Sequence, residues 1–174
     1  MRDAVEDDVP ALVALVTSAY RGDSSRAGWT TEADLLDGSR VDADLIRADL
    51  EAERSLILLA EREGRLVGCV HLQAVAGAPG RAYLGMFAVA PTEQGSGLGK
   101  QIMAAAERRV AQEWDSTEIE MTVIDVRAEL IAFYERRGYR RTGETAPFPY
   151  GDERFGTPKR DDLQMAVLRK PLGA

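Results

Sequence analysis

Three glycines at alternating positions are the residues best placed to do chemistry in this chain. They lie at positions 95, 97 and 99, between an apolar segment and a long segment with helical periodicity. Because glycine has no Cβ, the backbone N–H groups of such a loop can converge on an anion, and the dipole of the following helix favours negative charge there. The pattern of residues 94–100 therefore predicts a binding site for a phosphate or pyrophosphate group.

Two common nucleotide-binding patterns do not describe this loop. The dinucleotide pattern G-x-G-x-x-G is absent, and the P-loop pattern fails because Gln101 follows Lys100 where Ser or Thr is required. The pattern that does match is Gln-x-x-Gly-x-Gly, at Gln94, Gly97 and Gly99. An ordinary glycine-rich turn before a core helix would give the same six residues, so the loop alone leaves both interpretations open.

A second motif downstream favours the binding interpretation. Residues 133–139 read Phe-Tyr-Glu-Arg-Arg-Gly-Tyr at the end of a predicted helix. With both motifs in this order and spacing, the sequence resembles the GCN5-related N-acetyltransferase (GNAT) family over roughly residues 4–170. The resemblance implies a single domain over residues 1–174. Its expected class is mixed α/β (α+β), with a central, mostly antiparallel, splayed sheet and helices on both faces.

The resemblance also implies acetyl-CoA as co-substrate and no metal. It assigns the pyrophosphate to backbone amides of Gln94, Gly95, Ser96, Gly97, Leu98, Gly99 and Lys100. The pantetheine arm would pair with the end of the preceding strand, at Phe87, Ala88 and Val89, where a bulge would free backbone amides. Family members often carry Asn seven residues before the motif tyrosine. This chain has Arg127 there, and an arginine could reach a phosphate.

The implied reaction is direct attack of a primary amine on the thioester carbonyl in a ternary complex. The phenol of Tyr134 could protonate the departing thiolate, and the amide of Phe87 or Ala88 could stabilise the oxyanion. Glu32 and Glu120 are the candidate catalytic bases, with Glu120 otherwise a solvated strand residue.

Further base candidates carry alternative structural interpretations. Asp34 and Asp37 share the acceptor-side segment with Glu32. The only histidine, His71, is more typical of a structural residue on an apolar strand, and Cys69 is expected in the core because direct transfer needs no covalent thiol. The stretch 32–53 holds eight acids against two arginines, which predicts either a solvated helical face or an acidic wall that attracts a cationic acceptor.

The acceptor side is expected in two segments. Trp29 and Thr31 lie in a segment that resembles a bacterial subgroup of the family, and both are candidate substrate-binding residues. The loop 147–158 is long for a structureless connection, so it is a candidate lid. Its aromatic residues, which could wall an acceptor pocket or simply pack on the core, are Phe148, Tyr150 and Phe155.

Hydrophobic spacing predicts the elements that position these residues. The first helix is expected after Asp7 or Asp8, and Asp42 is expected to cap another. The segment 24–30 is expected as a loop, residues 31–36 as a short helix and 144–160 as a loop. Strands are expected at residues 2–5, 55–61, 66–75, 81–89, 118–123, 139–143 and 163–168, and the longer helices at 97–114 and 128–137.

The composition of the chain limits the classes of molecule that it is expected to bind. The 174 residues include 29 acids and 22 bases, for a formal net charge of −7, which argues against nucleic acid or an anionic membrane as the main partner. One cysteine and an acidic N-terminus predict a cytoplasmic protein without disulfides. The expected acceptor is an amine of a small molecule or of a peptide or protein N-terminus, and homodimers are common in the resembled family. The alternative is a non-catalytic module that binds coenzyme A as a sensor or regulator.

Overall fold

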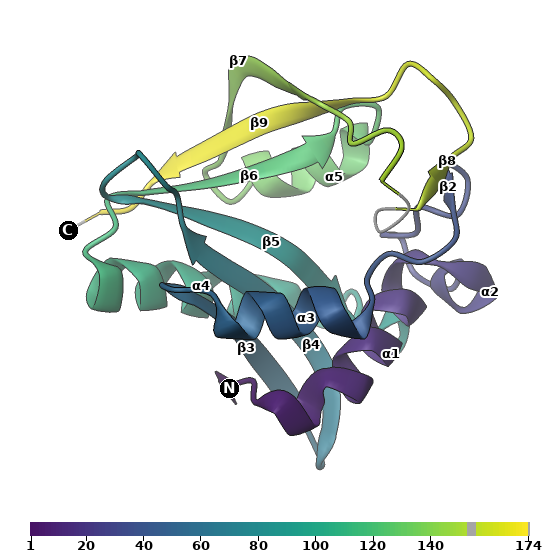
Figure 1. Ribbon diagram of the computed structural model, residues 1–174, viewed down its shortest axis with the longest axis horizontal. Coiled ribbons are helices and arrows are strands. Elements are labelled where there is room, and N and C mark those ends of the chain that lie inside the picture. The colour runs from purple at the N-terminus through teal and green to yellow at the C-terminus, as the bar shows by residue number, and fades with distance from the viewer. Residues whose placement is uncertain (153–155, 174) are drawn as a thin grey trace.

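A seven-stranded mixed sheet forms the centre of the molecule. The computed structural model describes residues 1–152 and 156–173. Within them, the strand order is β1-β3-β4-β5-β6-β9-β7, and β5–β6 is the one parallel pair (Figure 1). The strands are β1 (Arg2–Asp3), β3 (Ser55–Arg62), β4 (Arg65–Ala74), β5 (Arg81–Val89), β6 (Glu118–Ile124), β7 (Arg140–Pro147) and β9 (Gln164–Pro171).

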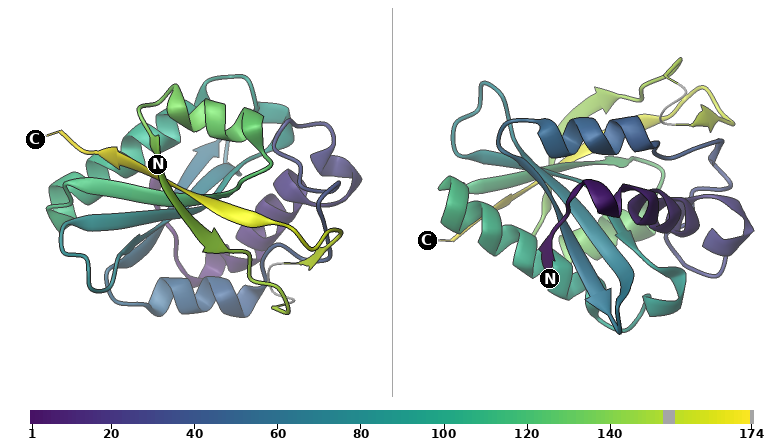
Figure 2. Two further views of the ribbon diagram at one scale, coloured as in Figure 1. Left: turned by 90° about the horizontal axis from the view of Figure 1, so that it is seen from above. Right: turned by 60° about the horizontal axis from the view of Figure 1, so that its bottom comes forward.

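Helices cover both faces of this sheet. They are η1 (Glu6–Asp8), α1 (Val9–Tyr20), α2 (Gly22–Ser25), α3 (Ala43–Glu51), η2 (Pro91–Glu93), α4 (Leu98–Trp114) and α5 (Ala128–Glu135). Figure 2 shows α3 on one side of the strands and α5 on the other, with α1 on the side of α3 and α4 on the side of α5. The predicted fold class, a mixed sheet between helices, is confirmed.

The centre of strand β3 is a continuous apolar run, residues 56–60, and its packing explains why. Ile57 and Leu59 pack with residues of α1 and α3, whereas Leu58 and Ala60 pack with residues of α4. Alternate side chains of a strand point to opposite faces, so a strand covered on both faces needs a continuous apolar run.

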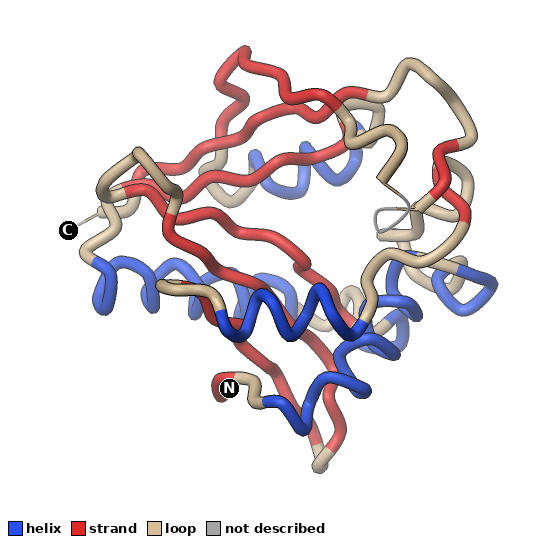
Figure 3. Tube along the Cα trace, viewed as in Figure 1, coloured by secondary structure: helices blue, strands red, loops and turns tan. Residues whose placement is uncertain are grey.

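The sheet opens between β5 and β6. The two strands pair only between residues 81–83 and 118–120, and beyond Tyr83 they diverge (Figure 3). On its other side, β5 carries a bulge: His71 pairs with Gly85 and Cys69 with Ala88, so two residues of β5 stand opposite one of β4. The splayed sheet and the bulge expected from the sequence are therefore both present.

Three local predictions were wrong in part. The expected loop at 24–30 begins with the last residues of the short helix α2. The expected helix at 31–36 is a single turn, because Leu36 enters a small second sheet that pairs β2 (Leu36–Asp37) with β8 (Thr157–Pro158). The expected loop at 144–160 contains the end of β7, which resumes pairing with β9 after a register shift beyond Arg141. In the second and third cases, pairing between residues far apart in the sequence decides the local structure.

The single histidine is buried between α3 and the sheet. Its Nε2 lies 2.8 Å from Ser55 Oγ, and its Nδ1 lies 3.6 Å from an Asp49 carboxylate oxygen. Ser55 donates its hydroxyl proton to the Asp49 carbonyl at 2.6 Å, so this serine is not arranged as a nucleophile. Burial lowers the pKa of His71 below 6.5, and Asp49 offsets only part of that effect.

We expect a pH-dependent stability from this histidine. A histidine pKa that is lower in the folded than in the unfolded state contributes stability that is present above pH 6.5 and is lost as the pH falls below that value. Urea denaturation should give a smaller free energy of unfolding at pH 5.5 than at pH 7.5, with a smaller difference in His71→Gln. An NMR titration midpoint of His71 at or above 6.5 would contradict this prediction.

Candidate active site

Two cavities meet at the bulge of β5. In the described part of the chain, one of about 580 Å³ lies between the glycine loop and α5, and one of about 340 Å³ lies between β5, β6 and the loop after β7. Four residues line both: Tyr20, Phe87, Leu130 and Tyr134. The two cavities are therefore adjacent, and these four residues lie at their boundary.

The glycine loop presents free backbone donors to the larger cavity. Gly95 and Gly97 have φ values of +83° and +86°, a conformation that other residues rarely adopt. Within the described residues their N–H groups donate no hydrogen bond. The first turn of α4 adds N–H groups that have no intrahelical acceptor. The N–H groups of Gln94, Ser96 and Leu98, which were also expected to bind the pyrophosphate, donate instead to the Pro91 carbonyl, the Glu93 carbonyl and Ser96 Oγ within the loop. The donors left for an anion cradle are therefore those of the two glycines and of the first turn of α4 beyond Leu98.

Cations line the same cavity. They are Lys100, Arg136 and Arg137, against the single acid Glu129 among the described lining residues. Arg137 lies over the ring of Phe133, 3.3 Å from its centroid, and burial lowers the pKa of its guanidinium. Sequence reasoning missed both arginines, although they directly follow the Tyr-Glu pair of the second motif. A local positive charge in a chain of net charge −7 fits a phosphate-bearing ligand.

The side chain of Gln94 connects the glycine loop to the segment before it. Its Oε1 accepts from the Trp29 N–H at 2.9 Å, and its Nε2 donates to Thr30 Oγ1 at 2.9 Å and to the Val89 carbonyl at 3.1 Å. A Cβ on Gly28 would lie 2.6 Å from Gln94 Oε1, so this close approach requires glycine. Gln94 therefore contributes a structural link through its side chain.

Two tyrosines mark the junction of the cavities. Tyr134 is buried, and its hydroxyl makes no hydrogen bond within the described residues. Burial raises the pKa of Tyr134. Tyr20 donates its hydroxyl to the Phe87 carbonyl, and burial raises the pKa of Tyr20 to about 12. Sequence reasoning identified Tyr20 only as a packing residue of the first helix, because helical spacing carries no signal for a contact 67 residues away.

Peptide planarity sets the direction of the amides at the bulge. The Cys69 thiol donates to the Met86 carbonyl at 3.5 Å, so the Phe87 N–H of the same trans peptide points away from Cys69. The Phe87 carbonyl points to Tyr20, so the Ala88 N–H points away from that hydroxyl and interacts with the Cys69 sulfur. Of the two residues whose amides are expected as oxyanion donors, Ala88 pairs with Cys69 in the β4–β5 ladder, whereas Phe87 has no register partner among the described residues. Burial raises the pKa of the Cys69 thiol to about 12, consistent with the expected core position.

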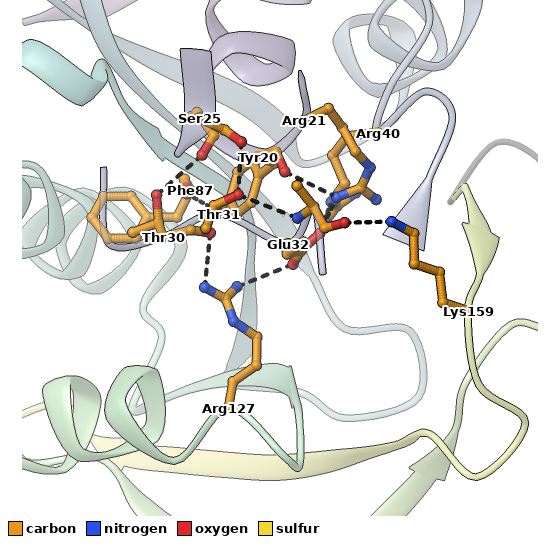
Figure 4. Close-up of polar contacts among 12 residues, drawn as sticks. Tyr20, Arg21, Ser25, Thr30, Thr31, Glu32, Arg40, Phe87, Arg127 and Lys159 are labelled. Carbon is orange, nitrogen blue, oxygen red and sulfur yellow. Dashed lines mark hydrogen bonds and ion pairs between the residues drawn. The ribbon is translucent and has the colours of Figure 1, made fainter. Parts of the chain in front are cut away.

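The smaller cavity contains an arginine cluster around one carboxylate. Glu32 is its only acid among the described lining residues. Its oxygens lie 2.6 Å from Arg21, 3.1 Å from Arg127 and 3.7 Å from Arg40, as Figure 4 shows. Because these contacts occupy both oxygens, the expected role of Glu32 as catalytic base does not fit its environment.

The Arg127 side chain does not lie where the sequence analysis expects it. It lines the smaller cavity and not the one beside the glycine loop. Its Nη2 donates to the Thr30 carbonyl at 2.7 Å while Nη1 donates to Glu32 (Figure 4). A contact with a phosphate at the glycine loop is therefore not supported, because the guanidinium is held on the acceptor side.

The other acids that the sequence suggests as catalytic bases line neither cavity. Glu120 forms an ion pair with Arg169 at 2.6 Å on β6 and lines neither cavity, which removes it as a base. Asp34 pairs with a surface arginine, and Asp37 pairs with Lys159. Within the described residues, no group of side chains could hold a metal ion.

The aromatic residues that the sequence suggests for the acceptor pocket lie in different places. Phe148 is buried and lines the smaller cavity, as expected. Trp29 lines the larger cavity instead, with its ring centroid 5.1 Å from that of Phe133. Tyr150 lines neither of the two and accepts the Leu163 N–H at 2.6 Å while packing on Phe148.

Two further expectations concern Thr31 and Phe155. Thr31 lines neither cavity, and its hydroxyl lies 2.7 Å from that of Ser25, which makes it a turn-stabilising residue. Phe155 lies outside the described residues. Among the residues that are described, no helix combines the length and apolar character needed to cross a membrane.

Residues 16–139 match the model of the acetyltransferase (GNAT) family. Among solved structures, a GNAT-family protein of Desulfovibrio desulfuricans has a TM-score of 0.73 at 20% identity, over 99% of this chain and 98% of that one. A ribosomal-protein-alanine N-acetyltransferase of Brucella melitensis has a TM-score of 0.70 at 22% identity, over 98% of both chains. The Escherichia coli ribosomal-protein-S18-alanine N-acetyltransferase has a TM-score of 0.71 at 16% identity, over 99% and 93%. At these identities the likeness shows the fold. No curated protein matches.

The cradle predicts a specific effect of Gly97→Ala. Alanine is strained at this positive φ, by about 1 kcal/mol, and relief of the strain would turn the loop amides away from the ligand. We expect calorimetry to show at least tenfold weaker binding of coenzyme A. Gly77→Ala, at φ +73° in the β4–β5 turn and likewise free of neighbours, is the matched control. Equal affinity in the two variants would contradict the assignment.

Proposed function

The chain belongs to the acetyltransferase (GNAT) family, and we propose that it is an acetyl-CoA-dependent N-acetyltransferase that acts on a primary amine. The acceptor is a small molecule or a peptide N-terminus. The observation that supports this most directly is the meeting of two cavities at Phe87 and Tyr134. One has the donors and cations for a phosphate-bearing carrier, and the other has an apolar wall suited to an acceptor.

The larger cavity fits acetyl-CoA by its chemistry. The N–H groups of Gly95 and Gly97, with Lys100 and Arg136, would bind the phosphates. The edge of β5 that β6 leaves unpaired beyond Tyr83 would bind the pantetheine amides. When bound there, acetyl-CoA supplies an acetyl thioester.

The reaction forms one bond and breaks one. The amine nitrogen attacks the carbonyl carbon, a C–N bond forms, the C–S bond breaks, the nitrogen loses one proton and the sulfur gains one. The Phe87 N–H would donate to the carbonyl oxygen as negative charge develops on it. Tyr20 supports this role by donating its hydroxyl to the carbonyl of the same residue, which helps to hold the bulge in place.

Tyr134 would supply the proton to the sulfur. Its hydroxyl is uncommitted within the described residues, and burial raises its pKa, so it stays protonated at neutral pH. It donates to sulfur as the C–S bond breaks and regains a proton from solvent.

The ammonium form of the amine would give one proton to solvent before the attack, and the nitrogen of the attacking neutral amine would lose its further proton to solvent as the amide forms. Glu32 is the one acid of the acceptor cavity among the described residues, and arginines hold both its oxygens. A neutral amine would therefore be the form that reacts, because an ammonium has no lone pair.

This predicts the pH dependence of catalysis. Below the pKa of the amine, the neutral fraction rises about tenfold per pH unit, so kcat/KM should rise with that slope and level off at the amine's own pKa. The measurement compares two acceptors of different pKa, whose profiles should shift with them. A shared enzyme pKa near neutrality for both would show that a side chain acts as the base.

The proposed acid is tested by Tyr134→Phe. We expect turnover to fall by about 10²-fold, in the range of general acid catalysis, with little change in the affinity for acetyl-CoA. Tyr139→Phe is the control, because Tyr139 is a buried tyrosine that lines neither cavity. Unchanged turnover in Tyr134→Phe would remove this residue from the role.

The activity itself is tested by release of coenzyme A from acetyl-CoA with a panel of primary amines, with the acetylated product identified by mass spectrometry. Binding of acetyl-CoA without release for any amine would contradict the proposal and favour a non-catalytic sensor.

A further inference from the structure

The acceptor cavity carries more positive than negative charge. Two arginines line it, Arg40 and Arg127, and a third, Arg21, is buried behind them. Among the described residues that line it, Glu32 is the only acid. Among the described residues that line the cavity, two guanidinium groups therefore stand against one carboxylate.

Arg40 is the arginine with unused donors. Arg127 donates to Glu32 and to the Thr30 carbonyl, and Arg21 donates to Glu32 at 2.6 Å. Arg40 is only 3.7 Å from Glu32 through Nε, and its terminal nitrogens make no hydrogen bond within the described residues. Its side chain is 26% exposed, so the guanidinium is partly desolvated and still open to a ligand.

Apart from Glu32, the acids of the stretch 32–53 are not placed to pair with Arg40 among the described residues. Asp42 accepts the Leu45 N–H at the start of α3, Asp44 pairs with Arg47, and Asp49 faces His71. None of these acids lines the acceptor cavity. The expectation of an acidic wall for a cationic acceptor is therefore not supported, and the local charge favours the opposite sign.

We propose that Arg40 binds a carboxylate of the acceptor, so that the acceptor class is a small apolar amine that also carries a carboxylate, such as an amino acid. The inference rests on the proposed function. A planar guanidinium with free terminal nitrogens matches a carboxylate in a bidentate arrangement, which gives both attraction and orientation.

The position of Arg40 fits a molecule in which the two groups are close. Its Cζ lies 5.5 Å from the centroid of the Tyr20 ring, and the hydroxyl of that ring contacts the Phe87 carbonyl at the bulge. The carboxylate and the reacting amine would thus lie on either side of one tyrosine ring. The rest of the cavity wall is largely apolar and includes Leu36, Val123, Ile124, Phe148 and Met165. An apolar side chain of the acceptor would bury surface there.

The test compares matched acceptors: L-leucine, L-leucinamide and isoamylamine, and the same series for L-methionine. We expect kcat/KM for the acids to exceed that for the amides by at least tenfold. Arg40→Met should lower kcat/KM for the acids by about 10- to 100-fold, mainly through KM, and leave the amides nearly unchanged. Arg40→Lys should recover part of the loss. Arg26→Met is the control, because Arg26 pairs with Asp34 at the surface and lines neither cavity.

The outcomes separate this inference from the proposed function. Equal or better acetylation of amides and amines by the unmodified protein would overturn the inference and leave the proposed function intact. If no amine releases coenzyme A, the proposed function fails, and the inference is decided by calorimetry with coenzyme A present. N-acetyl-L-leucine should then bind at least tenfold more tightly than N-acetyl-L-leucinamide, and Arg40→Met should abolish the difference. Equal binding of the two would overturn the inference.

Discussion

The peptide group between Met86 and Phe87 determines how this molecule is arranged around its candidate active site. An extra residue in β5 breaks the ladder with β4 at the same place where β6 diverges on the other side. Interrupted pairing of this kind leaves backbone groups without partners, and such groups are costly inside a protein. Here side chains satisfy two of them, since the Cys69 thiol binds the Met86 carbonyl and Tyr20 binds the Phe87 carbonyl. The Phe87 N–H remains, in the space between the two cavities.

The charged side chains also differ between the two cavities. The chain is acidic overall, yet cations line both cavities. In the larger one they stand beside free backbone donors, which suits phosphate. In the smaller one they surround Glu32. The role of this carboxylate is to hold the arginines in position, and not to accept a proton. A buried acid with several cationic partners has a positioning role, because removing it would leave those cations without compensation.

Local motifs explain which parts were predictable from the sequence. The glycine loop and the existence of each strand of the central sheet, though not all of the strand ends, follow from short-range patterns, because loop glycines and apolar runs depend on neighbours in the chain. Tyr134 was identified by the resemblance of its motif to the family. The arginine cluster could not be predicted, because Arg127 lies 95 residues from Glu32 in the sequence. The position of Arg127 relative to the second motif did not indicate which cavity its side chain would line. The same holds for Tyr20, whose contact with Phe87 exists only once α1 packs on the sheet. Trp29 and Thr31 belong to the expected segment, but the turn after α2 directs their side chains away from the acceptor cavity.

The Gln94 side chain joins two segments that serve different ligands. It spans from the glycine loop to the backbone of Trp29 and the hydroxyl of Thr30, and the Thr30 carbonyl in turn receives Arg127. Three hydrogen bonds thus connect the glycine loop, which lines the larger cavity, to Arg127, which lines the smaller cavity. A displacement of the loop would therefore also displace the wall of the smaller cavity. Linkage is reciprocal, so occupancy of either cavity would change the affinity of the other by the same factor. Coupled filling of the two cavities, and not independent filling, is the consequence of such a connection.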